Sequence, residues 1–102
     1  MAHCMVITTC AERDEAENTL VDRKLAACVQ INTIVSYFTW KGKINKESEY
    51  RLLIKTKEKL YKRVENYIKK MHSYEVPEII KIPIHDGSKE YLDWIDEVTE
   101  YN

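Results

Sequence analysis

The sequence predicts an α+β fold built on an antiparallel sheet, and three observations support this. A long stretch over 28–56 is rich in β-branched and aromatic residues and contains one glycine, Gly42, which is typical of two strands joined by a tight turn. Two further stretches, 60–71 and 91–98, carry apolar residues at helical spacing. The chain holds only two glycines and two prolines, so its elements are expected to be long and its connections short. We expect a single domain over 1–102.

The first part of the chain is expected to form a strand and then a helix. Residues 4–9 are a short apolar run without clean alternation, which is typical of a strand buried on both faces. Residues 12–26 lack glycine and proline, and Ala16, Leu20 and Ala27 follow one another at helical spacing. Acidic residues fill the first turns of this segment, where they stabilise a helix N-terminus.

The hairpin over 28–56 is longer than a compact domain of this size needs. A strand of about ten residues or more reaches beyond about 30 Å, whereas a domain of this length has a radius of gyration of about 13 Å. Large apolar side chains occupy both faces of the first strand towards the tip, among them Tyr37, Phe38 and Trp40. One copy of the chain cannot cover them, so we expect the arm to be covered by other copies.

The second half is expected to supply a helix, an edge strand and a final helix. Thr56 is the predicted N-cap of a helix that continues to Met71. Residues 79–84 read as a strand, and Pro83 places that strand at a sheet edge because it lacks an amide donor. The resulting order, strand-helix-strand-strand-helix-strand with a terminal helix, is the ferredoxin-like βαββαβ arrangement. Both main helices then cover one face of the sheet and leave the other bare.

The composition argues against several classes of protein. The net charge of −1 gives no electrostatic case for binding nucleic acid or an anionic membrane. Three irregularly spaced cysteines, without a secretory leader, indicate a reducing, cytoplasmic location. Cys4 and Cys10 are expected in the core. No nucleophile, metalloprotease or phosphate-loop motif occurs, and we do not expect an enzyme.

Residues 72–80, HSYEVPEII, resemble the HPYEVPEI signature of the CutA divalent-cation-tolerance family. Four other segments also resemble that family and follow its order, so the likeness covers nearly the whole chain: 25–29, 40–44, 53–56 and 91–94. Ser73 departs from the pattern, because the family usually has proline there. A proline at position 73 would restrict His72 to extended backbone. The Ser73 departure also lies inside the candidate site.

The resemblance implies a ferredoxin-like fold assembled as a homotrimer, similar in architecture to PII signalling proteins. The long hairpins would then pair between subunits through Tyr37, Phe38 and Trp40. It also implies a link to copper and other divalent metals, as binding or as tolerance. Some eukaryotic members are instead associated with anchoring acetylcholinesterase at membranes, so function within the family is not uniform.

The candidate metal ligands are Cys28, His72 and Glu75. A thiolate suits Cu(I), and an imidazole suits copper or zinc. The resemblance implies that these residues meet in a cleft near a subunit interface, with Lys55 and Tyr74 beside them. Two structural alternatives stay open: Cys28 as a small buried residue at a strand start, and His72 as a cap at a helix C-terminus.

We therefore expect a divalent-cation tolerance protein that binds copper or another divalent metal and needs no metal to fold. The alternative is a PII-like signalling or scaffold trimer that binds a small ligand or a partner protein in its inter-subunit clefts. A third possibility is a very stable trimer whose metal sensitivity is indirect.

Overall fold

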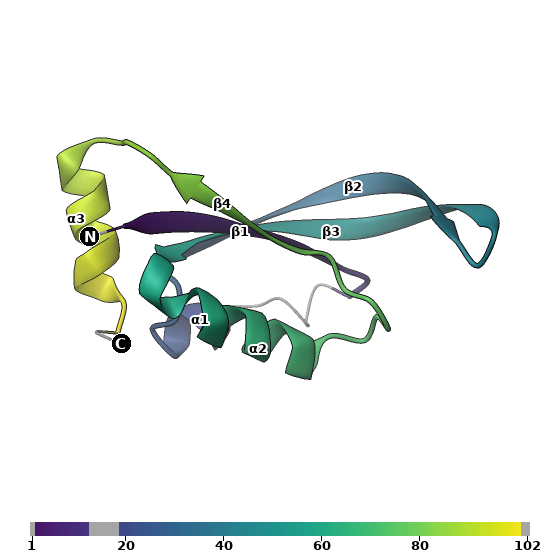
Figure 1. Cartoon of the computed structure of the whole chain (residues 1–102), viewed down its shortest axis with the longest axis horizontal. Helices are drawn as coiled ribbons and strands as arrows, with labels where there is room; N and C mark the ends of the chain where they lie inside the picture. Colours follow the sequence, from purple (N-terminus) through teal and green to yellow (C-terminus); the bar gives the residue numbers. More distant parts are fainter. Residues whose placement is uncertain (1, 13–18, 101–102) are drawn as a thin grey trace.

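The computed structural model describes residues 2–12 and 19–100, which form a four-stranded antiparallel sheet with helices against it (Figure 1). In chain order the elements are β1 (His3–Cys10), α1 (Thr19–Asp22), β2 (Cys28–Trp40), β3 (Lys43–Lys57), the 3-10 turn η2 (Glu58–Leu60), α2 (Tyr61–Met71), β4 (Ile79–Ile84) and α3 (Lys89–Val98). The predicted order of strands and helices is confirmed.

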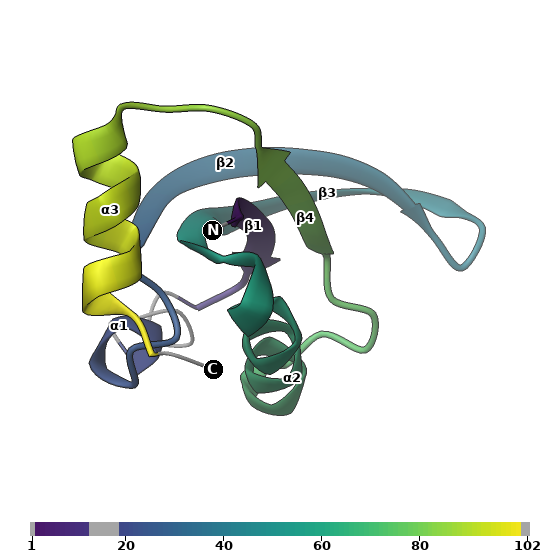
Figure 2. The same ribbon diagram turned by 60° about the vertical axis from the view of Figure 1, so that its left-hand side comes forward.

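The strands lie in the order β2-β3-β1-β4, and each neighbouring pair is antiparallel. β1 and β2 therefore run parallel to each other with β3 between them, which is the split βαβ arrangement. The proline-bearing strand, β4, lies at a sheet edge as predicted. Figure 2 shows α1 and α2 against one face of the sheet and α3 at the end where β1 begins, while the opposite face stays uncovered. No helix among the described residues is both long and apolar enough to span a bilayer.

The long hairpin is present and extends well beyond the rest of the fold (Figure 1). It turns at Lys41 and Gly42, whose φ angles of 52° and 78° match the two-residue turns that suit the twist of paired strands. Pairing between β1 and β3 ends where Cys10 meets Tyr50, so the outer part of β3 has only β2 as a neighbour. The chain consequently measures 45 × 24 × 20 Å.

Large apolar side chains stand exposed along this arm. The exposed set on β2 and β3 comprises Val35, Tyr37, Phe38, Trp40 and Ile44, with Tyr37 68% and Ile44 81% exposed. Monomeric proteins seldom display so many apolar side chains side by side. The arm therefore has the surface of an interface.

The core lies between the helix-facing side of the sheet and α2. Alternate residues of the strands, such as Val6, Leu52 and Ile54, point towards this side and are at most 3% exposed. Leu60 and Val64 close over them from the segment that follows β3. The apolar residues that alternate along the strands and those at helical spacing in α2 thus form one core cluster, as the sequence pattern predicts.

Two details of the predicted elements are wrong. The first helix was expected over 12–26, but its described part ends at Asp22, and Ala16 lies outside the described residues. Lys24 adopts a left-handed φ of 60°, and the amides of the two residues that follow it donate to the Leu20 carbonyl. This closes the helix and directs the chain into β2, because Ala27 then donates to the Lys55 carbonyl.

Thr56 is not a helix cap. It belongs to β3, is fully buried, and its hydroxyl donates to the Leu25 carbonyl over 2.6 Å. Lys57 occupies the N-cap position of η2 without a side-chain capping bond. The threonine hydroxyl therefore fastens the segment before β2 to β3, a tertiary role that local spacing did not reveal.

Candidate functional site

The three cysteines are free thiols and fall into two groups. Cys4 and Cys10 lie in the core, 0% and 2% exposed, as predicted. Burial, with a smaller effect from the Glu58 carboxylate, raises the pKa of the Cys4 thiol to about 11, so it stays protonated at neutral pH. Cys28 is half-buried at the start of β2, so it is the thiol that solvent can reach.

Cys28 lies beside Lys55 on the sheet face opposite α1 and α2, at the end where α3 packs. The two residues are directly opposed in the β2–β3 register, as the hairpin predicts. Ile54 points into the core, so its neighbour Lys55 and the facing Cys28 point the other way. The Lys55 ammonium lies 5.6 Å from the ring centre of Tyr91 on α3, so an aromatic ring lies beside the cation that faces Cys28 across the strands.

His72 follows α2 and is held at both ring nitrogens. Its backbone amide donates to the Ile68 carbonyl over 2.9 Å, so the backbone rather than the ring closes the helix. Nδ1 accepts the Tyr74 amide over 3.1 Å, and Nε2 contacts the Thr9 carbonyl. An amide always donates and a carbonyl always accepts, so Nδ1 is the acceptor of this ring and Nε2 is its donor.

Tyr74 links His72 to a buried carboxylate that the sequence did not single out. Its ring packs against the imidazole with centroids 4.6 Å apart, and its hydroxyl donates to Glu49 Oε1 over 3.0 Å. The other oxygen, Oε2, accepts the Ser36 hydroxyl. Glu49 is only 9% exposed. In the sequence it ends a continuous polar run, residues 45–49, and such a run predicts solvent exposure.

Cys28 and His72 do not meet within one chain. Cys28 lies opposite Lys55 on β3, while Thr9, the residue that His72 contacts, lies opposite Arg51 on the far side of β3. Four residues along the strand and two strand spacings across it separate the backbones of Cys28 and Thr9 by roughly 16 Å. Among the described residues, no group of three His, Cys, Asp or Glu side chains is close enough to hold a metal ion. The prediction that these residues meet across a subunit interface stays a prediction.

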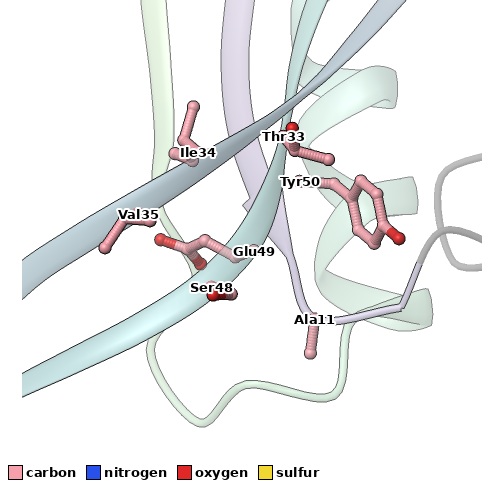
Figure 3. A pocket seen from close by; sticks show the side chains of 7 residues that line it. All are labelled: Ala11, Thr33, Ile34, Val35, Ser48, Glu49 and Tyr50. Atoms are coloured by element: carbon pink, nitrogen blue, oxygen red, sulfur yellow. The ribbon is translucent and has the colours of Figure 1, made fainter.

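Three adjoining hollows surround Glu49 at the root of the arm. The largest, of about 610 Å³, is formed by the arm strands and the residue after β1 (Figure 3); its lining is Ala11, Thr33, Ile34, Val35, Ser48, Glu49 and Tyr50. A second, of about 340 Å³, brings the arm aromatics Phe38 and Trp40 together with Tyr74 and Glu75. This volume is in the range of small-molecule sites, and Tyr74 and Glu75 both belong to its lining.

The geometry defines a small α+β protein with an exposed apolar arm, a reachable thiol on a bare sheet face and a cavity beside the 72–76 segment. Residues 4–98 match the family described as CutA1 divalent ion tolerance protein. The chain therefore belongs to the CutA1 family.

Individual relatives agree with this assignment. The divalent-cation tolerance protein CutA of Archaeoglobus fulgidus is 44% identical over 101 residues, which cover 96% of this chain and 99% of the relative. Its structure, described as periplasmic, superposes with a TM-score of 0.93 over 96% of this chain and 99% of its own. CutA1 from Oryza sativa, 33% identical, gives 0.95 over 100% and 97%. The chloroplastic CutA of Arabidopsis thaliana is 42% identical over 83 residues, or 80% of this chain and 46% of that longer protein.

Proposed function

We propose that this protein acts in divalent-cation tolerance by binding copper or another divalent metal at a site that includes Cys28. One observation carries the proposal. Cys28 is a half-buried free thiol on the sheet face opposite α1 and α2, whereas the other two thiols lie in the core. Thiolates are the preferred protein ligands of Cu(I) and good ligands of zinc. The family to which the chain belongs is named for tolerance of divalent ions.

We propose that His72 and Glu75 of a second copy complete this site. Imidazole and carboxylate are chemically suited to the same metals. Within one chain His72 contacts Thr9, whose backbone lies roughly 16 Å from that of Cys28, so a shared ion needs ligands from two copies. The exposed arm residues Tyr37 and Trp40 support assembly, for which we propose a homotrimer. The role proposed is binding, not catalysis.

A competition titration tests the site. Wild type, Cys28→Ser, His72→Gln and Glu75→Gln are titrated with Cu(I) against a chromophoric chelator, and with Zn²⁺ in parallel. Loss of one ligand from a complete site is expected to weaken binding at least about tenfold. The matched controls, Cys10→Ala and His85→Gln, remove a core thiol and an exposed imidazole, and they are expected to keep wild-type affinity. Unchanged affinity in both Cys28→Ser and His72→Gln would refute the proposed site.

A second candidate function is supported by the cavity beside the arm. Phe38, Trp40 and Tyr74 contribute aromatic surface to a space of about 340 Å³, and Glu75 adds a carboxylate. Such a space suits a small organic ligand and a PII-like signalling or scaffold role. A thermal-shift screen of metabolites and metals separates the two functions. A shift with a metabolite and none with any metal would favour the second.

The compartment is proposed from the thiols. All three cysteines are free, and two of them, both on β1, lie in the protein core. Free thiols persist in a reducing compartment, which supports a cytoplasmic location. Fractionation of cells followed by detection of the native protein tests this, and recovery from an oxidising compartment would contradict it.

A further inference from the structure

A chain of contacts joins the root of the arm to His72. Glu49 is the residue of β3 next to Tyr50, the last residue paired with β1. Its carboxylate binds Ser36 of β2 through one oxygen and the Tyr74 hydroxyl through the other. Tyr74 in turn fixes the imidazole by its ring and by its backbone amide. The buried carboxylate thus connects both arm strands to the segment that carries two of the proposed ligands.

This arrangement closes His72 to a metal ion. A metal at Nδ1 must displace the Tyr74 amide, which donates to that nitrogen. A metal at Nε2 must displace the Thr9 carbonyl and move the ring proton to Nδ1. That move is blocked while the Tyr74 amide points at Nδ1, because two N–H groups would then face each other. Both routes therefore require Tyr74 to move, and its hydrogen bond to Glu49 opposes that movement.

We propose that Glu49, acting through the Tyr74 hydroxyl, is a positioning residue that holds His72 in a closed state and limits metal binding there. The inference rests on the proposed function in taking His72 as a ligand. A protein that binds only in a minor open state shows an affinity reduced by the population of that state. A single hydrogen bond changes such a population by up to about tenfold. Loosening the bond should therefore strengthen metal binding.

The test uses Tyr74→Phe in the full-length protein, because this variant keeps the ring against His72 and removes only the hydroxyl. The residue-74 amide is expected to exchange with solvent about tenfold faster. The ¹⁵N shifts of His72 are expected to show both tautomers in place of one. Zn²⁺, used as a diamagnetic probe, is expected to bind about tenfold more tightly, and His72→Gln in the same chain is expected to abolish that gain.

Two further variants separate positioning from general loosening. Glu49→Ala is expected to behave as Tyr74→Phe does, whereas Glu49→Gln keeps an acceptor oxygen for Tyr74 and is expected to stay near wild type. Tyr61→Phe removes the hydroxyl of a half-buried tyrosine at the start of α2 and is expected to change neither exchange nor affinity.

Wild-type exchange rates and His72 shifts in Tyr74→Phe would overturn the inference. So would faster exchange without tighter Zn²⁺ binding, in a protein whose affinity depends on His72. Failure of the proposed function looks different. In that case Cys28→Ser and His72→Gln leave the wild-type affinity unchanged, while the exchange and shift data still report whether Glu49 holds His72 closed.

Discussion

Replacing Thr56 by valine is expected to destabilise the protein although the two side chains have the same shape. Thr56 is fully buried, and its hydroxyl donates to the Leu25 carbonyl over 2.6 Å. Valine keeps the volume and leaves that carbonyl without its hydroxyl donor. Leaving a buried polar group without its partner costs about 1–3 kcal/mol. For a domain of this size that corresponds to a fall in Tm of roughly 4–8 °C per kcal/mol.

Urea unfolding followed by circular dichroism measures the effect, at one fixed protein concentration because assembly adds to apparent stability. Thr56→Ser keeps the hydroxyl and loses one methyl group, which costs about 1 kcal/mol. Thr39→Val, on the exposed arm, is the matched control and is expected to be close to neutral. If Thr56→Val is as stable as wild type, the hydroxyl does not fasten the segment before β2 to β3.

Three further predictions follow from the same structure. At pH 7.5, iodoacetamide is expected to label Cys28 of the native protein first, because burial raises the pKa of Cys4 to about 11 and keeps it a protonated thiol. Mass spectrometry of the intact protein and of its peptides measures the order of labelling. Early labelling of Cys4 would contradict the prediction. Trp40→Lys places a charge among the exposed apolar residues of the arm and is expected to weaken self-association. Sedimentation over a concentration series measures this. Wild-type assembly of the variant at the lowest concentration would count against the arm as an interface. Gly42→Ala is expected to lower the free energy of unfolding by about 1–2 kcal/mol. Gly42 has a φ of 78°, where alanine is strained, even though nothing lies within 4 Å of the added methyl group. Unfolding by denaturant measures this, and an unchanged stability would mean that the turn relaxes freely.

Much of the fold was predictable because it depends on local patterns. The period of two over 28–40, the turn at Gly42 and the helical period of α2 are properties of neighbouring residues, and each appears where expected. The end of the first helix was not predictable in this way. The segment before Lys24 lacks breakers, but the left-handed residue and the pairing of Ala27 with β3 end the helix early. Tertiary hydrogen bonds outweighed a weak local preference.

The candidate site was predictable in its chemistry and not in its contacts. Cys28, His72 and Glu75 stand out by residue type and by resemblance, and the neighbourhood of Cys28 and Lys55 follows from antiparallel pairing. The distance between Cys28 and His72 depends on the order of three strands, which no local pattern contains.

By itself, the sequence determined an α+β chain with an oversized apolar hairpin, because backbone preference and side-chain alternation are local properties. Only the tertiary structure decided which polar groups are buried and what each one binds. Glu49 and Tyr74 lie 25 positions apart and Thr56 and Leu25 lie 31 apart, yet both pairs are hydrogen-bonded. Partners so distant in sequence meet only when the sheet brings β3 next to β1 and β2, because hydrogen bonds act over about 3 Å.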